Sequence, residues 1–529
     1  MAFCCGTKPR SHQPQPEDGV AKLPGPVDAL RKQIGAENLA TPEDGSAYQH
    51  RRFHGQGHTE SWNIHAIGHP SAIATATCVE HVQAIVNYAR EHCLPADVPF
   101  SVAGGRHGHL YMPNNGLVLD VSGLNSVSIA DEDPDAVTCT VGGGCTGLVF
   151  HDFLQKRGYV CVAGNHHSTG LAGQFLHGGH GYLERKMGMV VDNVVRVEVV
   201  TADGSLRACS REENEDLFWA CRGAVSNFGV AVSITVRLMR MTRDNMICVG
   251  TSVQVPKGEG RRRAILTNYV GAFGRRAELN ADKMGGLVCM AGGPVLHQVV
   301  FSGEPLPDAK SWSSSATSLY EGRSAQEVLE KVAKPWWKEF TKDHKLSPKC
   351  GVRCSHYFNQ LQKDPMSPPP SADYILTFEL SEVTEQVIDV FCEALLGKNK
   401  PKGLHLGLMM LMTAASTVSL GRGRDDMAYY HSDAAWHGMV HGICQHKGGA
   451  GKYEAGRRVA EQWANDVMKR MKATGCVLGG YNIFPNSEED PSILYGGNMD
   501  RLVELKGKYD EGNLFRRGAN VKPASTLSC

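Results

Sequence analysis

The chain has no excess charge of either sign, because Lys plus Arg number 55 and Asp plus Glu also number 55. Proteins that bind nucleic acid or an anionic membrane carry a basic excess or a clustered basic surface. We therefore expect neither partner. A small-molecule substrate is favoured instead.

Long apolar runs are missing as well. No stretch reaches the roughly 18 apolar residues of a membrane span, and residues 1–25 hold no run long enough for a secretory signal. We expect no membrane span, and a cytoplasmic location fits this pattern. Acylation of Cys4 and Cys5 stays open.

Regular cysteine spacing is also absent. The 17 cysteines follow neither the pattern of a disulfide scaffold nor the paired Cys-x-x-Cys of a zinc site. We expect reduced thiols and no metal site. Glycine, by contrast, is abundant, with 59 residues in 529 against an average share of about 7%.

The length exceeds what one hydrophobic core usually organises, so we expect two domains or one domain with a large insertion. Residues 1–60 are rich in Pro, Gly, His and charge, which predicts a poorly ordered arm. Apolar runs then predict strands at 72–77, 99–103 and 117–121, and helical spacing predicts a helix over 79–89. This order indicates an α+β domain.

The segment GGGCTG, residues 142–147, lies between a predicted strand and a predicted helix. It has the spacing of a dinucleotide-binding loop. That loop needs an acidic residue about 20 positions further on, and none occurs between Asp152 and Glu184. A tight turn with close helix packing is the favoured interpretation, and a nicotinamide-dependent dehydrogenase remains a rival.

Five motifs in series resemble the vanillyl-alcohol oxidase superfamily of FAD-linked oxidases. They are an apolar strand ending in Gly-Gly-x-His, the glycine-rich segment 170–181, the segment 188–204 with its Ala-Asp-Gly turn, Asp-Leu-Phe-Trp-Ala-x-Arg-Gly, and Asn-Phe-Gly-Val. Residues 495–523 are similar to the closing segment of its berberine-bridge-enzyme branch.

This resemblance implies a two-subdomain α+β domain of the PCMH type that binds FAD, and a substrate domain whose antiparallel sheet covers the flavin. The expected boundaries are residues 1–60 for the arm, 61–240 for the FAD-binding domain and 241–480 for the substrate domain. Residues 481–529 would form a C-terminal segment that returns to the FAD-binding domain.

The resemblance also implies which residues contact FAD. The expected set comes from the glycine loops and consists of Gly104, Gly105, Arg106, His107, Gly108, His109, Gly170, Gly173, Gly178, Gly179, Gly181, Gly229 and Val230. Glycine amides can form an anion site for the diphosphate, and Arg106 would add positive charge.

His107 occupies the position that bonds covalently to the flavin in many relatives. A non-covalent flavin loop stays open as an alternative. So does a metal site or a structural role, because His107 and His109 would share one face of an extended segment. The second, cysteine link of the branch is not expected, since His166 stands at that position and Cys161 lies five residues too early. His166 could hydrogen-bond the flavin edge or restrain His107.

Two residues are candidate catalytic bases. Tyr481 matches the first tyrosine of a family motif, although Ile483, Phe484 and Asn486 replace its other members. On a strand, His437 and His441 would share one face, and His441 could contact the substrate.

The expected activity is FAD-dependent removal of a hydride from a hydroxyl-bearing small molecule, such as a sugar, an alcohol or a secondary metabolite. Oxygen is the favoured reoxidant, giving hydrogen peroxide. A dehydrogenase that uses another acceptor and a catalytically silent flavin-fold protein are the alternatives.

Overall fold

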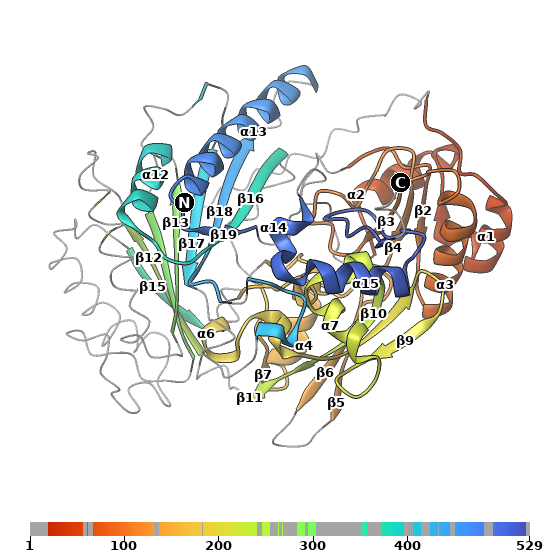
Figure 1. The fold of residues 1–529 in the computed structure, drawn as a ribbon, viewed down its shortest axis with the longest axis horizontal. Helices are drawn as coiled ribbons and strands as arrows, with labels where there is room; N and C mark the ends of the chain where they lie inside the picture. Colours follow the sequence, from red (N-terminus) through yellow and green to blue (C-terminus); the bar gives the residue numbers. More distant parts are fainter. Residues whose placement is uncertain are drawn as a thin grey trace.

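The computed structural model describes most of the N-terminal half of the chain and parts of the C-terminal half (Figure 1). The described residues are 19–56, 61, 67–131, 137–164, 166–181, 183–240, 246–253, 263, 267, 283–290, 295–302, 351–356, 372–395, 401–402, 404, 406–413, 424–431, 433–444, 450–480 and 490–524. They form three main sheets with helices packed on them.

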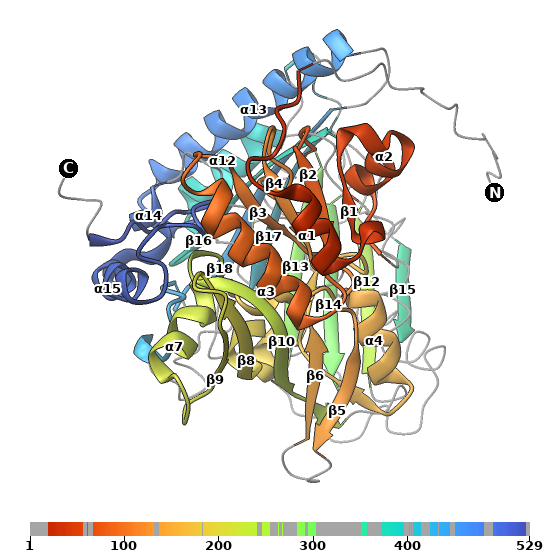
Figure 2. The ribbon, with the colours of Figure 1, turned by 90° about the vertical axis from the view of Figure 1, so that its right-hand side faces the viewer.

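The first sheet has four strands in the order β1-β2-β4-β3. Strands β2 (Ala72–Thr75), β4 (Leu117–Asp120) and β3 (Phe100–Ala103) are parallel, and helix α3 (Val79–Tyr88) makes the crossover that parallel strands require. The predicted strands and helix of this region are confirmed. Figure 2 shows α3 beside α1 (Val27–Ile34), which it contacts.

The expectation of a poorly ordered arm over residues 1–60 is wrong for the part that the structure describes. This part forms α1, the short strand β1 (Leu39–Ala40) and α2 (Ser46–Phe53). Its apolar side chains explain the difference, because Leu30 and Ile34 are buried in the core of the four-stranded sheet. Strand β1 also pairs with β2. The other domain boundaries stay predictions.

The second sheet has five strands in the order β5-β6-β10-β8-β9 and its strands pair antiparallel. They are β5 (Val127–Asp131), β6 (Thr138–Gly142), β10 (Gly229–Arg237), β8 (Val194–Thr201) and β9 (Leu206–Cys209). Helices α4 (Gly147–Gln155) and α7 (Glu215–Ala224) contribute side chains to the same core. A two-stranded pair, β7 (Tyr159–Val160) with β11 (Met239–Arg240), lies beside it.

The third sheet has eight strands in the order β15-β12-β14-β13-β17-β18-β16-β19. The strands are β15 (Gly351–His356), β12 (Met246–Val253), β14 (Val295–Ser302), β13 (Lys283–Met290), β17 (Leu406–Thr413), β18 (Trp436–Cys444), β16 (Ala372–Leu380) and β19 (Val477–Gly479). Helices α12 (Glu385–Leu395) and α13 (Ala450–Lys472) contact each other and cover one face (Figure 1). The sheet is antiparallel throughout, as the resemblance implied.

The C-terminal segment returns to the N-terminal half, as expected. Helices α14 (Pro491–Tyr495) and α15 (Met499–Tyr509) contribute buried side chains to the core of the second sheet, and α15 contacts α7 (Figure 1). Asn227 fixes this segment, because its side-chain amide donates to the Tyr495 hydroxyl and to the Ala519 carbonyl. Its amide oxygen accepts from the backbone of Val521 at 2.9 Å.

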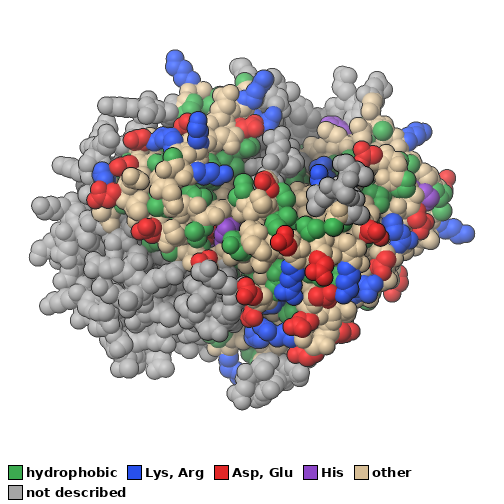
Figure 3. Space-filling view, in the orientation of Figure 1, with side chains coloured by type: hydrophobic (Ala, Val, Ile, Leu, Met, Phe, Trp, Pro, Cys, Tyr) green, Lys and Arg blue, Asp and Glu red, His purple; other side chains and the backbone are tan. Residues whose placement is uncertain are grey.

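The described surface in the view of Figure 3 carries Lys and Arg side chains interspersed with Asp and Glu. This mixture agrees with the zero net charge of the sequence. Among the described residues, no helix is both long enough and apolar enough to cross a membrane.

A buried lysine closes the turn after α15. The Lys506 ammonium donates to Asp510 at 2.7 Å, to the Phe515 carbonyl at 2.7 Å and to the Asn227 carbonyl at 2.8 Å. The side chains of Lys506 and Asp510 are both 0% exposed. All three ammonium protons therefore have acceptors, which is the condition under which a buried charge is tolerated.

Lys506→Met should destabilise the protein by about 3–5 kcal/mol, because it leaves the Asp510 carboxylate buried without its ion-pair partner. Lys508→Met is the matched control on the same helix. Lys508 pairs with Asp216 at the surface, so its loss should cost about 0–1 kcal/mol. Urea unfolding of both variants measures the difference. Equal effects would show that the buried pair does not hold the C-terminal segment in place.

Candidate functional site

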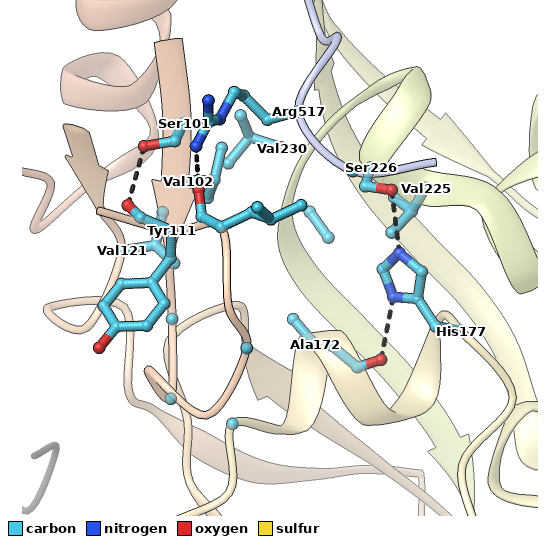
Figure 4. A pocket seen from close by; sticks show the side chains of 18 of the residues that line it. Ser101, Val102, Tyr111, Val121, Ala172, His177, Val225, Ser226, Val230 and Arg517 are labelled. Carbon is cyan, nitrogen blue, oxygen red and sulfur yellow. Dashed lines mark hydrogen bonds between the residues drawn. The ribbon is translucent and has the colours of Figure 1, made fainter. Parts of the chain in front are cut away.

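A cavity opens between the first and second sheets, and Figure 4 shows part of its lining. The loop of residues 104–111, which follows β3, forms one wall. Residues 169–174, at the start of α5 (Leu171–Phe175), face that loop. The beginning of β10 and the C-terminal Phe515, Arg517 and Gly518 complete the lining.

Most of the residues expected to contact the cofactor line this cavity. They are Gly104, Gly105, Arg106, His107, Gly108, His109, Gly170, Gly173, Gly229 and Val230. These residues come from three segments that lie far apart in the sequence, and the fold brings them to one place. His166 is not among the lining residues, but its ring lies 5.0 Å from that of His107.

Two of these glycines hold the facing loops together. A Cβ atom at Gly105 would lie 1.9 Å from the Gly170 nitrogen, and one at Gly170 would lie 2.4 Å from the Gly105 nitrogen. Gly108 and Gly173 have nothing within 4 Å of an added Cβ. The first pair is therefore needed for backbone contact, whereas the second pair leaves open space in the lining.

Gly178, Gly179 and Gly181 lie outside the cavity lining. A Cβ at Gly179 would lie 2.4 Å from the Gln174 carbonyl oxygen, and one at Gly181 would lie 2.2 Å from the Ala163 oxygen. Close packing against backbone accounts for both of these glycines. The assignment of this group to cofactor binding remains a prediction.

The glycines of GGGCTG also serve packing, as the turn interpretation predicted. A Cβ at Gly143 would lie 2.0 Å from the Ala231 oxygen, and one at Gly144 would lie 1.8 Å from the Val121 oxygen. Helix α4 follows directly at Gly147.

The expectation that Arg106 adds free positive charge is wrong. Its guanidinium is 0% exposed and pairs with Asp120 at 2.8 Å. It also donates to the Arg51 carbonyl at 2.7 Å. The carboxylate neutralises the charge, so the contribution of Arg106 is structural. Its φ of 59° turns the glycine loop through the left-handed region, which is uncommon outside glycine.

The cavity has polar residues that the sequence analysis missed. Arg517 donates to the Leu110 carbonyl at 3.4 Å, and Ser101 donates to the Tyr111 carbonyl at 2.8 Å (Figure 4). Burial lowers the pKa of Arg517, and nearby Arg516 lowers it further, although an arginine remains charged at neutral pH. Arg517 is thus a cation in the cavity lining, supplied by the C-terminal segment.

His107 is held in a chain of polar side chains. Its Nε2 hydrogen-bonds to the Ser168 hydroxyl at 2.8 Å, and this hydroxyl also contacts Nδ1 of His166 at 3.0 Å. Burial, together with His166 and His167, lowers the pKa of His107 to about 3. The imidazole is therefore neutral at physiological pH and keeps a nucleophilic nitrogen.

His177 lies on the opposite side of the cavity from Ser101 and Arg517 (Figure 4). Its Nδ1 hydrogen-bonds to the Gly173 carbonyl at 3.0 Å and its Nε2 to the Ser226 hydroxyl at 3.1 Å. Burial lowers its pKa to about 4, although the bond to Gly173 opposes the shift. No sequence motif singled out this residue.

The two candidate bases are placed differently. Tyr481 lies outside the described residues, so its role stays a prediction. His441 is buried on β18, opposite Ile375 of β16 and Leu408 of β17. A Cβ at the next residue, Gly442, would meet Ala460 of α13. Because successive strand residues point to opposite faces, His441 points away from α13. It does not line the cavity described above.

His437, on the same face of β18, belongs to a second polar cluster. Its Nε2 donates to Glu184 at 2.9 Å and its Nδ1 donates to Glu379. His180 donates from Nδ1 to Glu184 at 3.0 Å, and the Tyr429 hydroxyl donates to Glu379 at 2.8 Å. These side chains connect α6 (Glu184–Met187) and the loop before it with the eight-stranded sheet.

The charges in this cluster stabilise one another. Burial alone would lower the pKa of His437, but Glu379 and Glu184 outweigh it and raise the pKa to about 10. Burial alone would raise the pKa of Glu379, but the histidines, His437 foremost, lower it to about 2. The pKa of Glu184 is likewise held far below its usual range by His437 and His180, against the effect of burial.

Two family models match the chain. Residues 70–210 match an FAD binding domain, and residues 484–522 match the berberine and berberine-like family. The first match contains the Gly104–Tyr111 loop and the loop at Gly170 that faces it. The second contains Arg517.

Relatives extend this similarity along the chain. An FAD-linked oxidoreductase of Dictyostelium discoideum is 23% identical over 470 residues, which are 88% of this chain and 92% of that protein. An FAD-linked oxidoreductase of Aspergillus ruber is 36% identical over 190 residues, but these are only 35% of this chain and 37% of that protein.

Solved structures share the fold. The BBE-like 1 protein of Physcomitrella patens has a TM-score of 0.72 at 18% identity, covering 93% of this chain and 99% of its own. A carbohydrate oxidase from Microdochium nivale, in complex with a substrate analogue, has a TM-score of 0.71 at 20% identity, with 94% and 100% covered. A glucooligosaccharide oxidase of Acremonium strictum, whose structure revealed a novel flavinylation, has 0.71 at 17% identity, with 93% and 98% covered.

The low pKa of His177 makes stability depend on pH. Between pH 6.5 and about 4 the unfolded chain protonates this group and the folded protein does not, so stability falls as the pH falls through this window. One such group contributes up to about 1.4 kcal/mol per pH unit. His177→Gln should therefore lose less stability than the wild type between pH 7 and pH 4.5 in urea unfolding. If the wild type and His177→Gln lost the same stability over this pH range, His177 would not be the source of the pH dependence.

Proposed function

We propose that this chain, which belongs to the FAD-linked oxidases with a berberine-like C-terminal segment, oxidises a hydroxyl-bearing small molecule. The observation that carries the proposal is the cavity between the two glycine loops, with a neutral His107 in its wall. Bound FAD supplies a two-electron acceptor for a hydride removed from the substrate carbon.

The cavity residues fit FAD. Gly108 and Gly173 leave open space where side chains would otherwise project, and backbone with a left-handed turn at Arg106 can form a concave anion site for the diphosphate. Arg517 offers the positive charge that Arg106 does not. Apolar side chains such as Val230 and Phe515 can pack on flat rings.

His107 is proposed to bond covalently to the flavin through a ring nitrogen. Its neutral form supports this role, because a protonated imidazole has no free lone pair on nitrogen. Ser168 and His166 would orient the ring, since their hydrogen bonds form a continuous chain to His107. His166 thus has a positioning role in this proposal, and no second link through a cysteine is expected there.

On the substrate side, a base must accept the hydroxyl proton while the hydride leaves. Tyr481 and His441 remain the proposed bases. His441 is supported by its position on β18, on the face away from α13. A carbohydrate hydroxyl is the first substrate class to test, because carbohydrate oxidases share this fold.

Oxygen is the proposed reoxidant, with hydrogen peroxide as the product. The family resemblance implies that Ser168 and Thr169 lie near the reactive edge of the flavin, where a small side chain would leave space for oxygen. Another electron acceptor is the alternative, and the peroxide yield distinguishes the two.

His107→Ala should abolish the covalent link. We expect yellow colour in the acid-precipitated pellet of the wild type and in the supernatant of the variant. His109→Ala is the control, because His109 lies in the same loop but should not carry the link. Mass spectrometry of the peptide that contains residue 107 identifies the attached flavin. Colour that stays in the pellet of His107→Ala would contradict the assignment.

A carbohydrate substrate should bleach the flavin absorbance under anaerobic conditions. A panel of oligosaccharides, simple alcohols and phenolic secondary metabolites tests the substrate class, with each compound followed by visible absorbance. Admission of oxygen should restore the colour and release about one hydrogen peroxide per substrate oxidised. Bleaching that oxygen does not reverse would favour the dehydrogenase, and no bleaching by any of these compounds would argue against a hydroxyl-bearing substrate.

A further inference from the structure

We propose that His180, His437 and Glu379 form a binding site for a divalent transition-metal ion of the zinc type. The site joins the N-terminal half of the chain to the eight-stranded sheet. The proposal departs from the expectation of no metal site, and it does not depend on the flavin. The candidate ligand atoms of His180, His437 and Glu379 all lie within 4.8 Å of one another, and all three residues are buried.

Glu184 orients both histidines. One of its carboxylate oxygens accepts from His180 Nδ1 at 3.0 Å, and the other accepts from His437 Nε2 at 2.9 Å. A carboxylate that binds one ring nitrogen of a metal-binding histidine fixes the tautomer and the ring direction. Glu184 provides this for two histidines at once, and its side chain is 0% exposed.

The opposite nitrogens of both rings face Glu379. His180 Nε2 lies 3.7 Å from one Glu379 oxygen, and His437 Nδ1 contacts the other. The ring centroids of His180 and His437 are 3.3 Å apart. His180 Nε2 and His437 Nδ1 therefore face the same small space beside Glu379. A tetrahedral zinc ion holds its donors about 3.4 Å apart, and a contraction of about 1.4 Å from the 4.8 Å limit reaches that spacing.

The donor chemistry selects the class of ion. Two imidazoles and one carboxylate are a known zinc ligand set, and imidazole also suits other first-row divalent metals. A hard ion such as Mg²⁺ prefers oxygen ligands and is disfavoured here. The Tyr429 hydroxyl, which donates to Glu379 at 2.8 Å, holds the carboxylate in the way that outer-shell partners commonly do. Binding displaces the proton that His437 shares with Glu379.

The metal would link two parts of the fold. His180 and Glu184 belong to the segment that follows α5, whereas Glu379 and His437 are on the adjacent strands β16 and β18. Helix α6, which starts at Glu184, also contacts β13 (Figure 1). An ion bound here should therefore stabilise the contact between the two halves of the chain.

The test uses the purified flavin-containing protein, stripped with EDTA and then titrated with Zn²⁺ against a chromophoric chelator. We expect one tightly bound Zn²⁺ per chain and a rise of several degrees in the unfolding temperature, because a ligand that binds only the folded state stabilises it. His180→Ala and His437→Gln should each weaken Zn²⁺ binding by at least tenfold and remove most of the thermal shift.

His431→Gln is the matched control. His431 is also a buried histidine, but it contacts the Ile493 carbonyl and lies outside the cluster. Its variant should bind Zn²⁺ as the wild type does. Glu184→Gln, which keeps the size of the side chain, covers the case in which a histidine variant fails to fold. It should weaken binding less than His437→Gln, because Glu184 orients the ligands without being required as one.

X-ray absorption at the zinc edge identifies the ligands. Nitrogen and oxygen neighbours at about 2.0–2.2 Å support the site, whereas a sulfur neighbour at about 2.3 Å would place the ion at a cysteine and overturn the proposal. The proposal is also overturned if the stripped wild type binds no Zn²⁺, or if the histidine variants bind it as tightly as the wild type. The cluster would then be an ion-pair network held together by protons.

Discussion

The backbone contact between Gly105 and Gly170 is the constraint on which the cavity depends. A side chain at either position would come within 1.9 to 2.4 Å of the other backbone, so only glycine allows the two loops to meet. This contact joins the end of the four-stranded sheet to the segment before α5. It also brings His107 within hydrogen-bond distance of Ser168.

Local sequence patterns predicted the parts of the site that lie in short segments. The glycine loops and His107 could be found because glycine clusters mark close backbone approach and the motifs recur in a fixed order. Arg106 was misjudged for a physical reason. Its partner Asp120 lies 14 residues away on the next strand, and only the paired register of β3 and β4 shows that the two charges meet.

The second polar cluster could not be predicted from sequence. His437 and Glu184 are 253 residues apart, and Glu379 comes from a third segment. Taken alone in the sequence, each of these residues looks like an ordinary polar residue. The helices of the N-terminal arm were missed for a related reason, since the apolar side chains of Leu30 and Ile34 are diluted by charged neighbours and gain a core only when they pack on α3. Long-range packing decides both cases.

The buried histidines of the protein therefore lie in two kinds of environment. At the cavity, burial lowers the pKa of His107 and of His177 and keeps both rings neutral, which suits bonding through a nitrogen lone pair. Between the two halves, two buried carboxylates surround His437 and favour its charged form. The same side chain serves different chemistry because the fold places different partners around it.

A crystal structure of the purified yellow protein tests the central claim most directly. The account predicts FAD in the cavity bounded by the Gly104–Tyr111 loop, the start of α5 and Arg517, with its ring system next to His107. FAD bound elsewhere, or a ring system that lies away from His107, would contradict it.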